Sequence, residues 1–507
     1  MSVGAAVRAE QPTRQQVLVL ALACLGSFSV VMDATIVSIT LPDLRADLGF
    51  TPAALPWAVN AYTLAFAGCL LFGGRCADVF GRRRILLAGL GIFTVARVAA
   101  GFADTPGFLL AARAVQGFGG ALLMPVTLSM LTATFLEPAG RARALAIWSA
   151  VAAAGAAAGP VLGGLLTEWA GWRWVFFVLA PVGVVGMIGA FVVLPRQVTA
   201  VARPRLDAVG AVLVTAGLTG VVLAIMRSAA AGWTDPGVLG AVLGGSALIA
   251  IFAVHQAFWS AEPLLPLTIF RLRSVTSANI VIFLLGAGFL GSPILLSLYL
   301  QDVYGYSPFL AGIGYLPSGI AMVIGSRSAG WLTVRFGARR AAMLCCAIGG
   351  LGFLGTALGI ALGAPYFWSV LVSGMIFGYG TAAAFTPLTV AATDGVPPER
   401  NGLAAGVLNT VRQTSGAVGL AALSAIALSA GYGAAFAASG VCRGAACVLA
   451  RARMPGRAAR AGGGWRPAPP PPYGGGGVPD RPGSDPHRPA MSLTWQLGSV
   501  GRCPDLP

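Results

Sequence analysis

Two residues of opposite charge lie in stretches of sequence that are otherwise apolar. Asp33 belongs to VMDATIVSITLP, residues 31–42, and Arg113 lies in LLAARAVQGFGGA, residues 109–121. An ionised side chain at the centre of a membrane helix costs about 3 kcal/mol on insertion scales, so such residues are usually paired and functional. We therefore expect Asp33 and Arg113 to pair. A motion that changes their separation or hydration would then load and release a proton. The alternative is a structural carboxylate, hydrogen-bonded to a neighbouring helix.

The composition around these residues is that of a membrane protein. The chain is 57% hydrophobic and 10% charged, whereas soluble domains contain about 25% charged residues. All of its 33 basic residues are Arg, and they are scattered between apolar runs, which argues against a nucleic-acid-binding domain. Thirteen runs, from residues 16–38 to 403–430, are long enough to cross a bilayer as helices. Most of the loop arginines fall on the side of the N-terminus, which predicts that this side is cytoplasmic.

An internal repeat divides the chain. GRCADVFGRRR (74–84) follows the second predicted span, and GWLTVRFGARR (330–340) follows the tenth. The repeat predicts an all-α integral membrane protein with two pseudo-symmetric six-helix bundles and two extra helices between them. The predicted parts are a cytoplasmic N-terminus (1–15), an N-terminal bundle (16–194), two linker helices (195–265), a C-terminal bundle (266–436) and a tail (437–507).

The repeated loops suggest a conformational latch. In the first copy, Gly74 would permit close packing, and Asp78 would pair with an arginine or with a helix N-terminus across the bundle interface. The other latch candidates are Gly81 and Gly337, which the two copies share, Arg82 of the first copy, and Arg335 of the second copy, where the first copy has Val79. Val334 replaces the acidic residue in the second copy, so the alternative is a topological anchor without a latch.

A third motif, GAAAGPVLGG (155–164), is rich in small residues. Its glycines recur every three to four residues and form a stripe along which another helix can pack, while the proline allows a local kink; the residues are Gly155, Gly159, Pro160, Gly163 and Gly164. The alternative is ordinary packing of small residues without a role in transport.

Together these motifs resemble the Major Facilitator Superfamily, and specifically its fourteen-helix drug:proton antiporter branch. The resemblance covers roughly residues 15 to 438. It implies that Asp33 and Arg113 couple transport to protons and that GAAAGPVLGG is the motif typical of antiporters. It also suggests four polar residues as candidates for a central cavity, namely Thr35, Gln116, Asn409 and Arg412. The alternative for these four is a set of structural contacts between helices.

The resemblance implies a proton-coupled exporter of small amphipathic or hydrophobic compounds, such as drugs or antibiotics, working by alternating access. No catalytic constellation, metal-ligand spacing or cofactor fingerprint is visible, so we expect no enzyme activity and no cofactor. The expected partners are a small-molecule substrate, protons and the lipid bilayer of the cell membrane, with the chain acting as a monomer. The alternatives are an exporter of one endogenous metabolite and a membrane protein that does not transport.

The C-terminal part departs from this pattern. A fourteenth helix is expected after YGAAFAASG (432–440), but VCRGAACVLARAR (441–453) contains an arginine near its middle and few large apolar residues. We therefore predict that the last helix is missing or degenerate. Residues 437–507, rich in Pro, Gly and Arg, are predicted to be a disordered or frameshifted tail.

Overall fold

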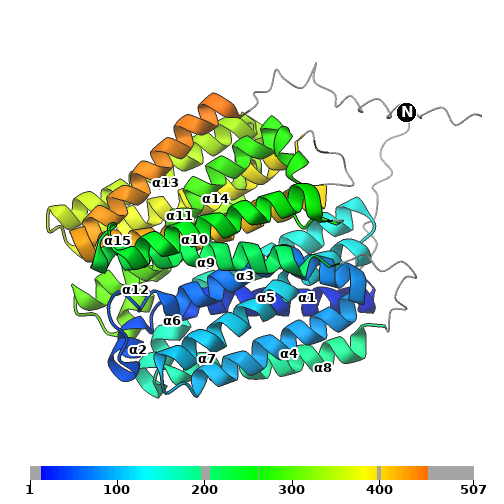
Figure 1. Ribbon diagram of the computed structural model, residues 1–507, viewed down its shortest axis with the longest axis horizontal. Coiled ribbons are helices and arrows are strands. Elements are labelled where there is room, and N and C mark those ends of the chain that lie inside the picture. The colour runs from blue at the N-terminus through cyan, green and yellow to red at the C-terminus, as the bar shows by residue number, and fades with distance from the viewer. Residues whose placement is uncertain (1–12, 196–205, 261, 395, 397–400, 455–507) are drawn as a thin grey trace, which may run out of the picture. The chain divides into compact units, whose positions relative to one another are not determined.

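The computed structural model describes residues 13–195, 206–260, 262–394, 396 and 401–454. Within these residues every assigned secondary-structure element is a helix, and thirteen helices are long and apolar enough to cross a membrane. The predicted all-α membrane fold is confirmed (Figure 1).

The N-terminal bundle contains the helices up to residue 193. They are α1 (Arg14–Ile36), α2 (Leu41–Leu48), α3 (Trp57–Phe80), α4 (Arg82–Gly101), α5 (Pro106–Thr134), α6 (Pro138–Ala170), α7 (Arg173–Phe177) and α8 (Ala180–Val193). The short α2 lies between the first two spans, and we call the end of the molecule that carries it the α2 end. Because apolar residues surround most of these helices, they are stable only when packed together and covered by lipid.

Two helices separate the bundles, as the repeat predicts. They are α9 (Ala208–Ala231) and α10 (Pro236–Val254), which continues as a π-helical turn, His255–Trp259. The two helices pack against each other, and α9 also contacts α3 and α15. The contact with α3 is close, since a Cβ atom on Gly68 would lie 2.0 Å from the hydroxyl oxygen of Thr215.

The C-terminal bundle repeats the pattern of the first. It contains the 3-10 turn Leu267–Arg271, α11 (Arg273–Asp302), α12 (Pro308–Phe336), α13 (Ala338–Ala361), the π-helical turn Phe367–Val372, α14 (Ser373–Thr393) and α15 (Asn401–Arg453). The two bundles meet where α6 packs against α12 and where α3 packs against α15.

The repeated loops have the same backbone geometry. Gly81 has φ 87° and ψ 143°, and Gly337 has φ 81° and ψ 155°. Each glycine is the C-cap of the helix before it and the N-cap of the helix after it. Only glycine adopts this region of backbone conformation without strain, which explains why both copies of the motif keep it.

The predicted end of the C-terminal bundle is wrong. Helix α15 bends at Gly431, with φ 85° and ψ 167°, and continues as a helix from residue 432 to residue 453. At 1.5 Å per residue this second segment is about 33 Å long, enough to cross a bilayer. It has the length of a fourteenth crossing, and it begins at residue 432 rather than after residue 440. Residues 437–453 are therefore not a tail, whereas residues 455–507 lie outside the described residues.

Small residues explain why this segment is a helix despite its arginine. Gly433 contacts Ile360, and Gly440 lies against Leu354, so the segment runs antiparallel to α13 at close range. Arg443 is fully buried at the interface, with its guanidinium 4.7 Å from the ring centre of Phe353. The arginine thus points into the bundle rather than into lipid, a position that a reading of hydropathy alone does not reveal.

Fourteen crossings predict that the two ends of the described chain lie on the same side of the membrane. Reporter proteins fused before Thr13 and after Met454 are expected to report the same compartment. Paired fusions to a fluorescent protein and to alkaline phosphatase, which are active on opposite sides, measure this. Opposite compartments for the two ends would contradict the second crossing of α15.

Candidate functional site

Asp33 lies between two arginines inside the N-terminal bundle. Its Oδ2 atom accepts a hydrogen bond of 2.5 Å from Nη1 of Arg113, and its Oδ1 atom lies 2.8 Å from Nη2 of Arg97. The exposed fractions of the three residues are 0% for Asp33, 0% for Arg113 and 1% for Arg97. We call these three residues the charge cluster. It joins α1, α4 and α5, and with all three groups ionised it carries a net positive charge.

Arg113 is held by further contacts on α3, α5 and α7. Its Nε atom donates to the carbonyl of Ala58 at 3.1 Å, and its Nη1 atom also donates to Oε1 of Gln116 at 2.8 Å. The guanidinium lies 4.6 Å from the ring centre of Tyr62 and 5.9 Å from that of Phe176. Aromatic faces stabilise a desolvated guanidinium, so the arginine is anchored in one orientation.

Arg97 is the residue of the cluster that the sequence did not predict to lie beside Asp33. Its Nη2 atom also donates to the carbonyl of Val175 at 3.4 Å, and its guanidinium lies 5.8 Å from the ring centre of Phe93. The available signal was an arginine in the middle of a predicted span. Its partner was not evident because Arg113 already accounted for the charge of Asp33.

The glycine-rich motif contacts two different helices. A Cβ atom on Gly159 would lie 2.1 Å from Oγ1 of Thr35 on α1. A Cβ atom on Gly163 would lie 2.6 Å from the carbonyl oxygen of Ile36, also on α1. A Cβ atom on Gly164 would lie 2.3 Å from the carbonyl oxygen of Pro308 on α12. The other two motif residues also make such contacts, Gly155 with Phe28 of α1 and Pro160 with Gly312 of α12. The motif therefore positions the helix of Asp33 and also forms part of the interface between the bundles.

The four cavity candidates are divided between the two bundles. Gln116 is fully buried beside Arg113. Thr35 donates to the carbonyl of Met32 at 3.1 Å and packs on α6. On α15, Asn409 accepts a hydrogen bond from Arg412, whose guanidinium lies 5.0 Å from the ring centre of Phe385.

Among the residues that the structure describes, the latch candidates do not form an ion pair with one another. Asp78 and Arg335 are exposed, and within the described residues neither forms an ion pair. Nε of Arg82 donates to the hydroxyl of Ser129 on α5 at 2.7 Å, and Gly81 and Gly337 form the helix junctions. The ion pair of Asp78 is therefore not seen among the described residues, and because residues 196–205 and 397–400 lie outside them, the latch stays a prediction.

The predicted role of Gly74 is also corrected, because the close approach occurs one residue earlier. A Cβ atom on Gly73 would lie 2.1 Å from the carbonyl oxygen of Ala121. On Gly74 it would lie at an ordinary 3.6 Å from Cβ of Pro125. Sequence spacing alone does not show which of two adjacent glycines faces the neighbouring helix.

This difference gives a prediction. Gly73→Ala is expected to reduce stability by about 1–3 kcal/mol, because α3 must move away from the backbone of α5. Gly74→Ala is expected to change it by no more than about 0.5 kcal/mol. Thermal unfolding of the two purified variants measures both effects, and equal losses would contradict the assigned contact.

Contacts at the α2 end join the two bundles. Arg45 lies 3.3 Å from Asp302, Nε2 of Gln301 donates to the carbonyl of Ile39 at 3.1 Å, and the amide of Phe309 donates to Glu168 at 3.1 Å. We call these three contacts the collar.

A further carboxylate fixes α2 to its own bundle. Oδ2 of Asp47 accepts from the indole of Trp172 at 2.9 Å and from Arg173 at 2.6 Å. These two hydrogen bonds lower the pKa of Asp47 below its ordinary value, so the contact is ionised at neutral pH.

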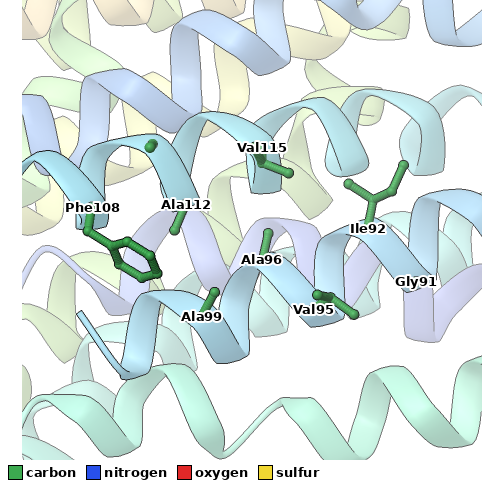
Figure 2. Close-up of a pocket in the computed structure, with 9 residues that line it drawn as sticks. Gly91, Ile92, Val95, Ala96, Ala99, Phe108, Ala112 and Val115 are labelled. Carbon is green, nitrogen blue, oxygen red and sulfur yellow. The ribbon is translucent and has the colours of Figure 1, made fainter.

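A groove between α4 and α5 is lined by apolar residues alone. It has a volume of about 570 Å³ and is lined by Gly91, Ile92, Val95, Ala96, Ala99, Phe108, Ala111, Ala112 and Val115 (Figure 2). None of these side chains is polar. Arg97 and Arg113 belong to the same two helices but are buried, whereas Val95, Phe108 and Val115 are about half exposed or more. The groove is thus separate from the charge cluster.

Two related helical bundles, a buried charge cluster and thirteen helices able to cross a membrane within the described residues define a polytopic membrane protein. The sequence pattern of the Major Facilitator Superfamily matches residues 23–420 and 335–473. The chain therefore belongs to this family, and the predicted family is confirmed.

Several relatives are named for antibiotics. The cephamycin export protein CmcT of Amycolatopsis lactamdurans is 42% identical over 406 residues, covering 80% of this chain and 83% of that protein. The puromycin resistance protein pur8 of Streptomyces alboniger is 37% identical over 429 residues, covering 84% of each. The tetracenomycin C resistance and export protein of Streptomyces glaucescens is 32% identical over 408 residues, covering 80% and 74%.

A solved structure has the same fold. The crystal structure of the D-xylose-proton symporter superposes with a TM-score of 0.64, covering 87% of this chain and 98% of that one. At 14% sequence identity this likeness concerns the fold alone.

Proposed function

We propose that this protein exports small amphipathic or hydrophobic compounds, such as antibiotics, in exchange for protons. The observation that carries the proposal is the position of Asp33 between Arg97 and Arg113, where both carboxylate oxygens hold an arginine. Protonation of Asp33 removes the charge that holds α4 and α5 to α1. A proton therefore changes the relative stability of two arrangements of the bundle, which is the requirement for coupling. The export and resistance functions named for the relatives support the direction of transport.

Alternating access is the mechanism that fits these contacts. In this conformation the collar joins the bundles at the α2 end. The opposite end carries the arginine clusters that follow Gly81 and Gly337, so by the positive-inside rule it is cytoplasmic. The α2 end then faces outward, and breaking the collar releases the substrate to the outside of the cell membrane.

The narrower alternative is export of one endogenous compound. It is favoured by the names of the three relatives above, each of which refers to a single antibiotic, whereas a further relative is named a multidrug resistance protein. A compound panel distinguishes the two, because a multidrug exporter moves several unrelated members and a dedicated exporter moves one.

Transport into inside-out membrane vesicles tests the proposal. Labelled puromycin, a cephamycin and ethidium are supplied outside the vesicles, and an interior-acid pH gradient is imposed. We expect gradient-dependent accumulation of at least one compound, and its collapse by the ionophore nigericin. Vesicles carrying an Asp33→Asn variant are the control. Accumulation that persists without the gradient, or none for any compound, would contradict a proton-driven exporter.

A further inference from the structure

Arg412 is a charged side chain in a membrane-spanning helix, and no acidic side chain among the described residues pairs with it. It lies on the first segment of α15, where Asn409 accepts a hydrogen bond from its Nη2 atom. Its guanidinium lies 5.0 Å from the ring centre of Phe385 on α14. Nothing in the described part of the chain places a carboxylate within 4.0 Å of it, and its Nε atom has no hydrogen-bond partner there.

The other buried arginines have contacts of a different kind. Arg97 and Arg113 share Asp33. Arg443 is fully buried and donates to the carbonyl of Leu285, so no ligand reaches it without a rearrangement of the bundle. Arg412, in contrast, is only partly buried.

These contacts leave the guanidinium incompletely compensated. An amide oxygen and an aromatic face stabilise a desolvated cation, but neither neutralises it. An anion would do so, and the planar arrangement of N–H groups in arginine matches a carboxylate. Phe385 adds an apolar surface beside the charge, on which an aromatic or aliphatic group can pack.

The helix position of Arg412 bears on whether this residue can contact a transported compound. The helix that carries Arg412 contacts α3 of the other bundle, and its neighbour α14 carries Phe385. Arg412 thus lies on a helix that takes part in the interface between the bundles, while its own side chain lies against α14 of the same bundle.

We propose that Arg412, Asn409 and Phe385 form a binding site for an organic anion, an apolar compound that carries a carboxylate. This inference rests on the proposed function in taking the anion to be transported cargo. Arg412 holds the carboxylate, Asn409 fixes the orientation of the guanidinium, and Phe385 contacts the apolar part.

Calorimetric titration of the full chain in detergent tests the site with a matched pair of probes, 2-naphthoate and its neutral amide, 2-naphthamide. The wild type is expected to bind 2-naphthoate at least tenfold more tightly than 2-naphthamide, because only the carboxylate forms a charge-assisted hydrogen bond with Arg412. Arg412→Gln is expected to lose this preference while it binds 2-naphthamide unchanged, and Arg412→Lys to retain part of it. Arg453→Gln, at the exposed end of the same helix, is the control and should behave as the wild type.

A second variant tests the same point without removing the arginine. Asn409→Asp supplies a carboxylate to Arg412 from within the chain, so the site is neutralised and the preference for 2-naphthoate is expected to disappear. Equal affinity of the wild type for the two probes, or a preference that survives in Arg412→Gln or Asn409→Asp, would overturn the proposal. Vesicle transport is measured separately. If the wild type exports in response to the gradient but does not prefer 2-naphthoate, the binding site is refuted and the proposed function stands. If the wild type prefers 2-naphthoate but does not export, the proposed function is refuted.

Discussion

Asp33→Asn is expected to reduce gradient-driven export to background while the protein still inserts into the membrane. The asparagine has nearly the same shape, but it carries no charge to hold Arg97 and Arg113 and cannot bind and release the proton. Breaking a buried ion pair by removing one partner typically costs about 3–5 kcal/mol, because the remaining charge is left uncompensated. Export is measured in vesicles, and stability by thermal unfolding of the purified variant.

Two comparisons separate coupling from mere loss of stability. Asp104→Asn removes an exposed carboxylate and should leave export unchanged. Arg113→Gln combined with Asp33→Asn should lose no more export than either single variant, because the pair acts as one unit. Additive losses, or wild-type export by Asp33→Asn, would show that the charge cluster is structural only.

Gly164→Val is expected to abolish export by preventing closure at the α2 end. Any Cβ atom at this position would lie 2.3 Å from the carbonyl oxygen of Pro308, so α6 and α12 must separate. The contact of Phe309 with Glu168 lies beside it and would be lost with the separation. A cysteine introduced at Ile39, buried at this end of the molecule, reports the opening. Its labelling by a membrane-impermeant maleimide in intact cells is expected to increase several-fold.

Gly244→Val in α10 is the matched control. A Cβ atom there has no neighbour within 4 Å, so the same substitution should leave export and labelling unchanged. Unchanged labelling of the Ile39 cysteine in Gly164→Val would contradict the role of this contact in closure.

The sequence predicts the overall fold well because each span is specified locally. Composition and run length indicate thirteen spans, and the repeat at Gly81 and Gly337 indicates two bundles and the two helices between them. These signals do not depend on which face of a helix meets which neighbour. The pairing of Asp33 with Arg113 was predictable for a similar reason, since a buried acid and a buried base in one bundle have few other partners.

The errors concern contacts that depend on how the helices are rotated. Arg97 and Gly73 face neighbouring helices, which a single span does not reveal. The final helix was missed because Arg443 lowers its hydropathy, although the side chain is enclosed by the bundle. In each case the deciding interaction joins residues far apart in the sequence.

The glycine junctions also determine how the molecule can deform. Gly81, Gly337 and Gly431 each connect two long helices through a single residue with φ between 81° and 87°. One residue offers only two soft torsions, and at these positions both already lie in a region that other residues avoid. A change of angle between two helices joined in this way must therefore use the two torsions of one glycine, a residue that adopts many backbone conformations without strain, so these junctions are points at which the joined helices can pivot.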